Sequence, residues 1–331
     1  MRAITVLMPG GPEQLIVAEL PAPQPGPGEI LIRVHSAGLN RADLLQRQGH
    51  YPPPPGASPL LGLEVSGEVA AVGPDPQEHW RVGDRVCALL PGGGYAEYAV
   101  ASEGCCLPVP EGMPLSDAAA LPEAVFTVWA NLFSTAPGQA TAARVERGER
   151  LLVQGGSSGI GSVALQLARA RGVLAAATAG SAEKCQACLG LGAVFAVDYH
   201  EDWAEAIRAW APDGVDVILD MVAGPYFRKH LALLGTGGRL AHIATAQGSE
   251  VQLDIRELMH KRLVITASML RARSPALKRG LRDEILREVW PLLETGALAP
   301  VIQARFPAQE AAAAHREMEK GAHTGKLLLE F

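Results

Sequence analysis

The residues best suited to chemistry form a glycine-rich turn between a short apolar run, 151–153, and a helix-forming run, 162–171. Glycines allow a tight turn and a close approach of the backbone to a pyrophosphate, whose negative charge is favoured by the N–H groups and dipole at the start of a helix. Glycines also make ordinary turns, but this turn opens a series of alternating strands and helices. We therefore predict a dinucleotide site whose contacts include Gly155, Gly156, Ser158, Gly159, Ile160 and Gly161.

The choice of dinucleotide depends on the end of the next apolar run, 173–178. An NAD enzyme usually places an acidic residue there to hold the ribose 2′-hydroxyl, but this run is followed by Gly180, Ser181 and Lys184. A hydroxyl and an ammonium suit a 2′-phosphate better than a bare hydroxyl, so we predict NADPH. Ser181 could instead only cap the next helix while Lys184 lies in solvent, and the nearby Glu183 argues against NADPH.

Six apolar runs alternate with helical stretches through the middle of the chain, a pattern typical of a parallel sheet covered by helices on both faces. Six strands complete a doubly wound Rossmann sheet. The expected strands are 151–153, 173–178, 194–197, 215–220, 239–244 and 263–267.

The rest of the chain differs in character. Proline and glycine clusters separate short strand-like runs such as 29–37 and 68–72, which favours an irregular, mostly β domain. An amphipathic helix at 276–293 and a strand at 326–330 are expected later in the chain. The fold class is therefore α/β. The expected domains are a catalytic domain at 1–123, an NADPH-binding domain at 124–300 and a return to the catalytic domain at 301–331.

Composition excludes several other classes. The 331 residues, 48% of them apolar, can form two cores, and the net charge of −6 is spread along the chain without a basic block for nucleic acid. No apolar run approaches the length of a membrane span, and the first residues lack a signal-peptide pattern, so we expect a cytoplasmic protein. The five cysteines should be reduced, and Cys185 and Cys188 should share a helix face rather than a metal, because no further ligand follows them.

Several turn-rich segments are too specific to arise from composition. They are the opening PGGPE, GLNRADLLQRQGHYPPPPGAS at 38–58, LGLEVSGEVAAVG at 61–73, GDRVCALLPGGGYAEY, AALPEAVFTVW and the terminal GKLLLEF. Through them, essentially the whole chain resembles the quinone oxidoreductases of the medium-chain dehydrogenase/reductase superfamily, and most of all the group of the tumour-suppressor-inducible quinone oxidoreductase and its bacterial relatives. The resemblance implies a Rossmann domain and a mostly β, GroES-like catalytic domain.

The resemblance also implies a reaction without zinc. Zinc-dependent alcohol dehydrogenases of the superfamily have Cys where this chain has Asn40 and His where it has Leu63, and the four-cysteine lobe is missing after residues 88–90. Without a Lewis acid to stabilise an alkoxide, an alcohol or ketone is a poor substrate. A quinone, or an alkene conjugated to a carbonyl, accepts hydride more readily and fits better.

Three polar residues match those that line the nicotinamide and substrate cleft of the family: Asn40, Asp43 and Tyr51. Tyr51 has a phenol that is neutral near pH 7 and can donate a hydrogen bond or a proton to a quinone oxygen as charge develops. Tyr51 could also simply pack on the neighbouring prolines, and Asn40 and Asp43 could be turn residues that satisfy the local backbone. Other matches extend the cofactor site: Thr127, Tyr199, Ala244, Ser268, Leu270, Gly325 and Lys326.

The expected function is direct hydride transfer from NADPH to a small quinone, with neither metal nor flavin. An NADPH-dependent reductase of enones, alkenals or enoyl thioesters stays open, as does an NADPH-binding protein with a structural role, like the crystallins related to the family. The chain departs from the family at Ser158, which replaces a common glycine, and in the loop 139–147, which looks several residues longer. The resemblance also implies a homodimer joined through sheet edges, with 263–267 at the joining edge.

Overall fold

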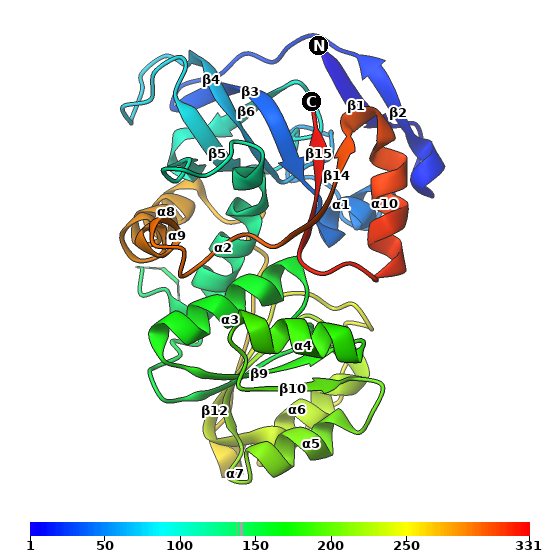
Figure 1. The fold of residues 1–331 in the computed structure, drawn as a ribbon, viewed down its shortest axis with the longest axis vertical. Helices are drawn as coiled ribbons and strands as arrows, with labels where there is room; N and C mark the ends of the chain where they lie inside the picture. The colour runs from blue at the N-terminus through cyan, green and yellow to red at the C-terminus, as the bar shows by residue number, and fades with distance from the viewer. Residues whose placement is uncertain (137, 140–141) are drawn as a thin grey trace. The chain divides into compact units, whose positions relative to one another are not determined.

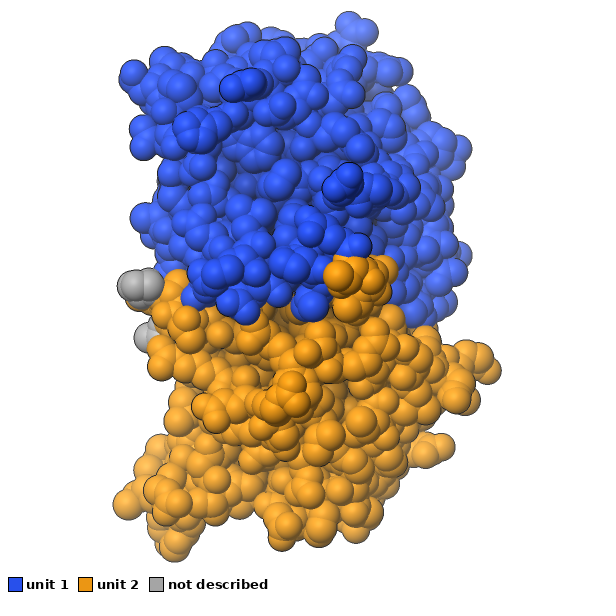
Figure 2. Space-filling model, turned by 60° about the vertical axis from the view of Figure 1, so that its left-hand side comes forward, with its two compact units in different colours: residues 1–126, 271–294, 300–331 blue, residues 127–270, 295–299 orange. Residues whose placement is uncertain are grey.

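The computed structural model describes all residues except 137, 140 and 141. The described residues form two compact units: unit 1 comprises Met1–Phe126, Arg271–Glu294 and Pro300–Phe331, and unit 2 comprises Thr127–Leu270 and Thr295–Ala299 (Figure 2). The domain boundaries expected at residues 123 and 300 stay a prediction. They differ from the units chiefly in Arg271–Glu294, which is part of unit 1. The loop expected at 139–147 lies partly outside the described residues.

Unit 2 is built around a parallel sheet in the order β10-β9-β8-β11-β12-β13. Its strands are β8 (Arg150–Val153), β9 (Leu174–Ala179), β10 (Phe195–Asp198), β11 (Val215–Asp220), β12 (Leu234–His242) and β13 (Val264–Ala267). The predicted doubly wound sheet is confirmed, because the chain direction across the sheet reverses between β8 and β11. β12 begins earlier than expected, because Leu234 pairs with Val215 before an irregularity shifts the register.

Helices cover both faces of this sheet (Figure 1). α3 (Gly159–Arg171) and α4 (Ala182–Leu191) lie on one face, and α5 (Trp203–Trp210) and α6 (Phe227–Leu233) lie on the other. The buried residues Trp203, Ile207 and Leu231 pack on the sheet from α5 and α6. Shorter elements complete the unit: the π-helical turn η4 (Trp129–Phe133), the 3-10 turn η5 (Gly224–Tyr226) and α7 (Ile255–Lys261).

Unit 1 is mostly β. Its larger sheet has the order β14-β15-β3-β4-β5-β7, with β6 also paired to β3, and β1 pairs with β2 in a separate sheet. The strands are β1 (Arg2–Val6), β2 (Leu15–Glu19), β3 (Glu29–Gly38), β4 (Glu64–Val72), β5 (Arg85–Leu89), β6 (Tyr98–Ser102), β7 (Cys106–Pro108), β14 (Ile302–Pro307) and β15 (Lys326–Glu330). β15 pairs antiparallel with β3, which confirms a C-terminal strand at 326–330 and places it in the sheet of the N-terminal part of the chain.

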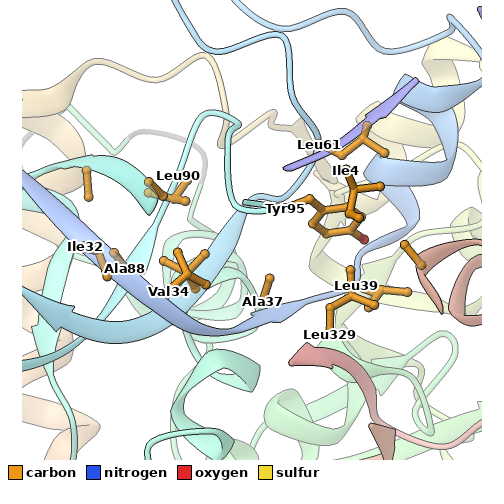
Figure 3. Packing of buried hydrophobic residues seen from close by; sticks show 14 of the residues in the cluster. Ile4, Ile32, Val34, Ala37, Leu39, Leu61, Ala88, Leu90, Tyr95 and Leu329 are labelled. Atoms are coloured by element: carbon orange, nitrogen blue, oxygen red, sulfur yellow. The ribbon is translucent and has the colours of Figure 1, made fainter. Parts of the chain in front are cut away.

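The core of unit 1 lies against this sheet (Figure 3). Alternate residues of β3, among them Ile32 and Val34, are buried in it, as expected for a sheet with one covered face. Leu329 of β15 joins the same cluster, and the ring of Tyr95 is completely buried there. The helical elements are η1 (Pro12–Gln14), α1 (Arg41–Arg47), η2 (Glu103–Cys105), η3 (Asp117–Ala120), α2 (Pro122–Val128), α8 (Pro275–Glu288), α9 (Trp290–Glu294), η6 (Ala308–Glu310) and α10 (Ala311–Lys320). The last two residues of α2 belong to unit 2.

The single helix expected at 276–293 is divided in the structure. α8 ends at Glu288 and α9 begins at Trp290. Pro291 explains the break, because a proline has no N–H to donate and its ring clashes with the carbonyl four residues earlier. None of the helices in the described ranges has the length and apolar character that a membrane crossing requires.

Candidate active site and cofactor site

The glycine turn of unit 2 has the close packing that its sequence predicts. Gly155 has a φ of +70°, which favours glycine. A Cβ added at Gly161 would lie 2.3 Å from the carbonyl oxygen of Gly155, and one at Gly156 would lie 2.6 Å from the Cβ of Ala177. Larger residues at these positions would push the turn off the strand and helix that it joins.

Ser158 completes the turn as the N-cap of the 13-residue helix α3, and its Oγ accepts a hydrogen bond of 3.0 Å from the backbone N–H of Gly161. The N–H groups of Gly159 and Ile160, both partly exposed, have no acceptor among the described residues. They offer the donors and the dipole that a pyrophosphate requires, so the turn fits a dinucleotide.

A buried polar chain supports this turn from behind. The Oγ1 of Thr178 accepts a hydrogen bond of 3.2 Å from the N–H of Gly155 and donates one of 2.6 Å to the Oε1 of Gln154. The Nε2 of Gln154 lies 3.0 Å from the Nε2 of His230. Burial lowers the pKa of His230 to about 4, so the imidazole is neutral near pH 7 and accepts from Gln154. None of these three supporting side chains was expected from the glycine pattern.

This series of buried polar side chains ends at Asp220, the last residue of β11. Its buried carboxylate accepts hydrogen bonds from the backbone N–H groups of Val222 and Ala223 at 2.8 Å and 3.0 Å. It also lies 2.8 Å from the Nδ1 of His242 and 3.7 Å from the Nδ1 of His230. Asp220 therefore fixes the loop that leaves β11 at the carboxyl edge of the sheet.

The structure brings together the residues expected at the adenosine phosphate. Ser181 is the N-cap of α4, and its Oγ accepts a hydrogen bond of 3.3 Å from the N–H of Lys184, so the capping role considered for it is present. Lys184 is partly buried, and burial lowers its pKa. The hydroxyl of Tyr199 lies over Gly180, where a Cβ would approach it to 2.4 Å. Glu183 is fully exposed, and hydrogen bonds from its own N–H and from Ser181 lower its pKa.

Thr127 and Ser268, two further residues expected at the cofactor site, both bind Asn131, which sequence reasoning missed. The buried Asn131 donates a hydrogen bond of 2.8 Å to the carbonyl of Thr127 and accepts one of 2.7 Å from the hydroxyl of Ser268. Ala244 is exposed beyond the end of β12, and Leu270 is buried. An asparagine within the otherwise apolar run 128–133 is the sequence signal that could have identified Asn131.

In unit 1, Asn40 and Asp43 begin α1. The N–H of Asn40 donates to one oxygen of Asp43 at 2.8 Å, and the N–H of Gly62 donates to the other at 2.9 Å. Asp43 is completely buried, and burial raises its pKa to about 6. Its oxygens satisfy the local backbone, which is the alternative considered for it. A catalytic role for Asp43 stays a prediction, and these contacts favour positioning.

Asn40 also belongs to a buried cluster with Glu64 and Lys326. The amide of Asn40 donates a hydrogen bond of 2.9 Å to Glu64, and the ammonium of Lys326 donates to Asn40 at 2.8 Å and forms an ion pair with Glu64. The second oxygen of Glu64 accepts from the N–H of Glu123 at 2.8 Å. Lys326 was expected to contact the cofactor, but its ammonium binds these two side chains. It follows Gly325, whose φ of +77° favours glycine.

Tyr51 lies half-buried on the proline-rich loop that follows α1. Burial raises the pKa of its phenol, the charge of Glu123 raises it further, and the guanidinium of Arg271 lowers it. The phenol is therefore neutral near pH 7. Its hydroxyl has no hydrogen-bond partner among the described residues, so it remains able to donate to a substrate oxygen.

Unit 2 thus contains a turn that fits a dinucleotide, and unit 1 contains a neutral phenol. Leu63, at the second position where zinc dehydrogenases have a ligand, is 2% exposed and apolar. Within residues 1–136, 138–139 and 142–331, no group of three or more His, Cys, Asp or Glu side chains is arranged to hold a metal ion.

Comparisons with known proteins cover the whole chain. Family models match as an alcohol dehydrogenase GroES-like domain at residues 26–111 and a zinc-binding dehydrogenase at residues 191–329. Quinone oxidoreductase of Mus musculus is 33% identical over 339 residues, covering 99% of this chain and 97% of the relative. The structure of Escherichia coli quinone oxidoreductase complexed with NADPH is 26% identical with a TM-score of 0.87, covering 100% of both chains. The enoyl reductase CurK is 26% identical with a TM-score of 0.85, covering 99% of this chain and 98% of that one.

Proposed function

Because this chain belongs to the quinone oxidoreductase family of the medium-chain dehydrogenase/reductase superfamily, we propose that it reduces small quinones with NADPH and needs neither zinc nor flavin. The observation that carries the proposal lies at the two positions where zinc dehydrogenases have ligands. Asn40 binds the ammonium of Lys326, and Leu63 is buried and apolar. Neither offers the imidazole or thiolate that zinc prefers, so the site suits an acceptor that takes hydride without a Lewis acid.

The residues of the chain divide the work between binding and proton donation. When bound, NADPH supplies the hydride. The free N–H groups of Gly159 and Ile160 hold the pyrophosphate, and Ser181, Lys184 and Tyr199 hold the adenosine phosphate. Further proposed cofactor contacts are Thr127, Gly155, Gly156, Ser158, Gly161, Gly180, Ala244, Ser268, Leu270, Gly325 and Lys326.

Tyr51 is the proposed catalytic residue. Its neutral phenol donates a hydrogen bond to the quinone oxygen on which negative charge develops, and the proton that completes the reduction comes from this phenol or from water. Asn40 and Asp43 are proposed to shape the site around it. The binding of Asn40 to Glu64 and Lys326 fixes the orientation of its amide.

A substrate panel tests the proposal. NADPH oxidation is measured at equal concentrations of ortho-quinones, para-quinones and enones, with NADH in a parallel series. Faster turnover of quinones and a preference for NADPH support the proposal. A preference for enones would instead assign the chain to the enone, alkenal or enoyl reductases, which its similarity to an enoyl reductase also supports.

A binding or structural role is the second alternative. Tight NADPH binding without turnover on any member of the panel would favour such a crystallin-like function. The similarity to quinone oxidoreductases over 97% of the Mus musculus relative supports the enzyme instead.

We further propose that two copies associate through β13. This strand is the edge of its sheet, and apolar side chains are exposed on it and on the preceding helix: Val264 is 49%, Ile255 60% and Met259 71% exposed. An unpaired strand edge beside apolar surface favours pairing with a second copy. Val264→Lys should convert a dimer to a monomer in size-exclusion chromatography with light scattering, and a monomeric wild type would contradict the proposal.

The proposed compartment is the cytoplasm. All five cysteines are free thiols, which supports a reducing environment. Fractionation of cells that express the chain, with detection by antibody, tests this location, and recovery in a secreted fraction would contradict it.

A further inference from the structure

Arg271 makes a set of contacts around Tyr51, the proposed catalytic residue. Its side chain is 8% exposed. The Nε donates a hydrogen bond of 2.7 Å to the carbonyl of Pro91, and the Nη2 donates one of 2.7 Å to the Oε1 of Gln46. The Nη1 donates a longer one, 3.4 Å, to the carbonyl of Tyr51. One planar guanidinium therefore joins α1, the loop after it and the turn at residues 91–94.

The same guanidinium lies over the aromatic ring of Tyr51, with its Cζ 5.2 Å from the ring centroid. A cation at this distance over a ring is attracted to the π face. Arg271 thus holds Tyr51 twice, by the ring and by the backbone carbonyl. Both contacts lie within unit 1 and join residues 220 positions apart in the chain.

The loop that carries Tyr51 has few other means of fixing the ring. Residues 52–55 are prolines, which have no N–H to donate. The loop beyond them is tied by a bond of 3.0 Å from the N–H of Ala57 to the carbonyl of Pro54, and by one of 2.9 Å from the amide of Gln46 to the carbonyl of Pro59. Neither bond touches Tyr51, whereas the guanidinium contacts both its ring and its backbone carbonyl.

Arg271 is itself fixed from the next helix. The ammonium of Lys278, on the first turn of α8, donates a hydrogen bond of 2.8 Å to the carbonyl of Arg271. The backbone at Gly92 lies close to the guanidinium, because a Cβ added there would be 3.3 Å from the Nη2 of Arg271. The guanidinium is therefore held in one place by several elements, as the support of a functional side chain must be.

We propose that Arg271 is a positioning residue that holds the ring of Tyr51 in the orientation from which its hydroxyl donates to the substrate oxygen. The substrate half of this statement rests on the proposed function. The structural half, that the guanidinium sets the environment of the Tyr51 phenol, does not require any turnover.

The structural half is tested by fluorine NMR of protein labelled with 3-fluorotyrosine. The chain has five tyrosines, and the Tyr51 resonance is assigned by its absence in Tyr51→Phe. The charges that face the phenol are those of Arg271 and Glu123. Removing the positive charge in Arg271→Met should move this resonance and raise its titration midpoint, because a cation stabilises the phenolate. Arg271→Lys should give a smaller rise, since it keeps the charge but loses the planar contacts.

Arg282→Met is the matched control. Arg282 lies on α8, is 7% exposed and binds Glu78 and Asp283. The variant therefore loses a guanidinium that is about as buried as that of Arg271 but does not contact Tyr51. In Arg282→Met, the chemical shift and titration midpoint of the Tyr51 resonance should be those of the wild type. A Tyr51 resonance and midpoint that are unchanged in Arg271→Met, or changed equally in Arg282→Met, would overturn the proposal.

The catalytic half is tested by a double-mutant cycle with Tyr51→Phe. Arg271→Met should lower kcat about tenfold with the KM for NADPH unchanged, because a small misplacement of a reacting group is enough for such a loss. In the Tyr51→Phe background the same substitution should cost less than about twofold, since Arg271 acts through the phenol. If Arg271→Met lowers kcat as much in the Tyr51→Phe background as in the wild type, the proposal is overturned. If the wild type does not turn over quinones, the proposed function is contradicted, and the fluorine resonance of Tyr51 alone decides the role of Arg271.

Discussion

Lys326 and Asn40, 286 positions apart in the chain, are joined by a hydrogen bond of 2.8 Å from the ammonium Nζ to the amide Oδ1. Both also bind the buried carboxylate of Glu64. The strand β15 thus completes a cluster that begins at Asn40, the N-cap of α1. The ammonium of Lys326, a residue expected to contact the cofactor, pairs here with a buried carboxylate.

Lys326→Met should destabilise unit 1 strongly, because it leaves Glu64 buried without its cation. Breaking a buried pair by removing one partner costs about 3–5 kcal/mol, and urea denaturation measures the loss. Lys320→Met is the control, since Lys320 pairs with Glu317 at the surface and its side chain is 65% exposed. That change should cost less than about 1 kcal/mol. Equal losses in the two variants would show that the buried pair has no special role.

Thr178→Val should weaken NADPH binding. It removes the acceptor for the N–H of Gly155 and the donor to Gln154, so the glycine turn loses its support. One such hydrogen bond contributes about 1 kcal/mol, so the loss of both should raise Kd by at least about fivefold. Titration calorimetry measures Kd, and Thr178→Ser, which keeps the hydroxyl, should bind as the wild type does. The idea fails if valine and serine variants bind NADPH equally well.

Lys184→Met should reduce the preference for NADPH. Loss of a charge-assisted contact to the 2′-phosphate predicts about a tenfold weaker NADPH affinity with NADH affinity unchanged. The control is Arg208→Met, which removes an exposed cation of the same unit that pairs with Glu205. If both cofactors weaken together in Lys184→Met, the ammonium stabilises helix α4 rather than reading the phosphate.

The stability of unit 2 should fall in acid because of His230. Its pKa is about 4 in the folded protein against 6.5 as a reference, so between these values the unfolded chain binds a proton that the folded one does not. Stability from this group is complete above about pH 6.5 and is lost as the pH falls towards 4, up to about 3 kcal/mol. His230→Gln should flatten this dependence in denaturation measured from pH 7 to 4.

A variant is needed because Asp43 acts in the opposite direction. Its pKa is raised to about 6, so its contribution is complete below the reference value of 3.8 and is lost as the pH rises through 6. The same slope in the wild type and in His230→Gln would contradict the assignment.

The sequence specified the sheet of unit 2 well, because buried parallel strands are continuous apolar runs and their helices have clear starts. Strand 215–220 has the bounds expected, and the N-caps Ser158 and Ser181 mark the starts of α3 and α4. The start of β12 was missed, because residues 235–238 include three glycines and give no apolar signal. Pro291 could have indicated the break between α8 and α9.

The site in unit 1 was harder to predict, because its contacts join distant parts of the chain. Asn40, Asp43 and Tyr51 were predicted from the resemblance to the family, but nothing local shows that Asp43 is completely buried. Arg271 lies in no motif and meets Tyr51 only in the folded unit. Residue types can suggest which side chains do chemistry, whereas burial and long-range pairing decide which of them are free to do it.

The most direct test of the central claim is the rate of NADPH oxidation with a small ortho-quinone by purified, chelator-treated protein, with Tyr51→Phe measured alongside. We predict that turnover survives the chelator, prefers NADPH over NADH and falls about tenfold in Tyr51→Phe, because a general acid contributes at least this much. Loss of turnover on chelation, or its absence with every quinone tried, would contradict a zinc-free NADPH-dependent quinone reductase.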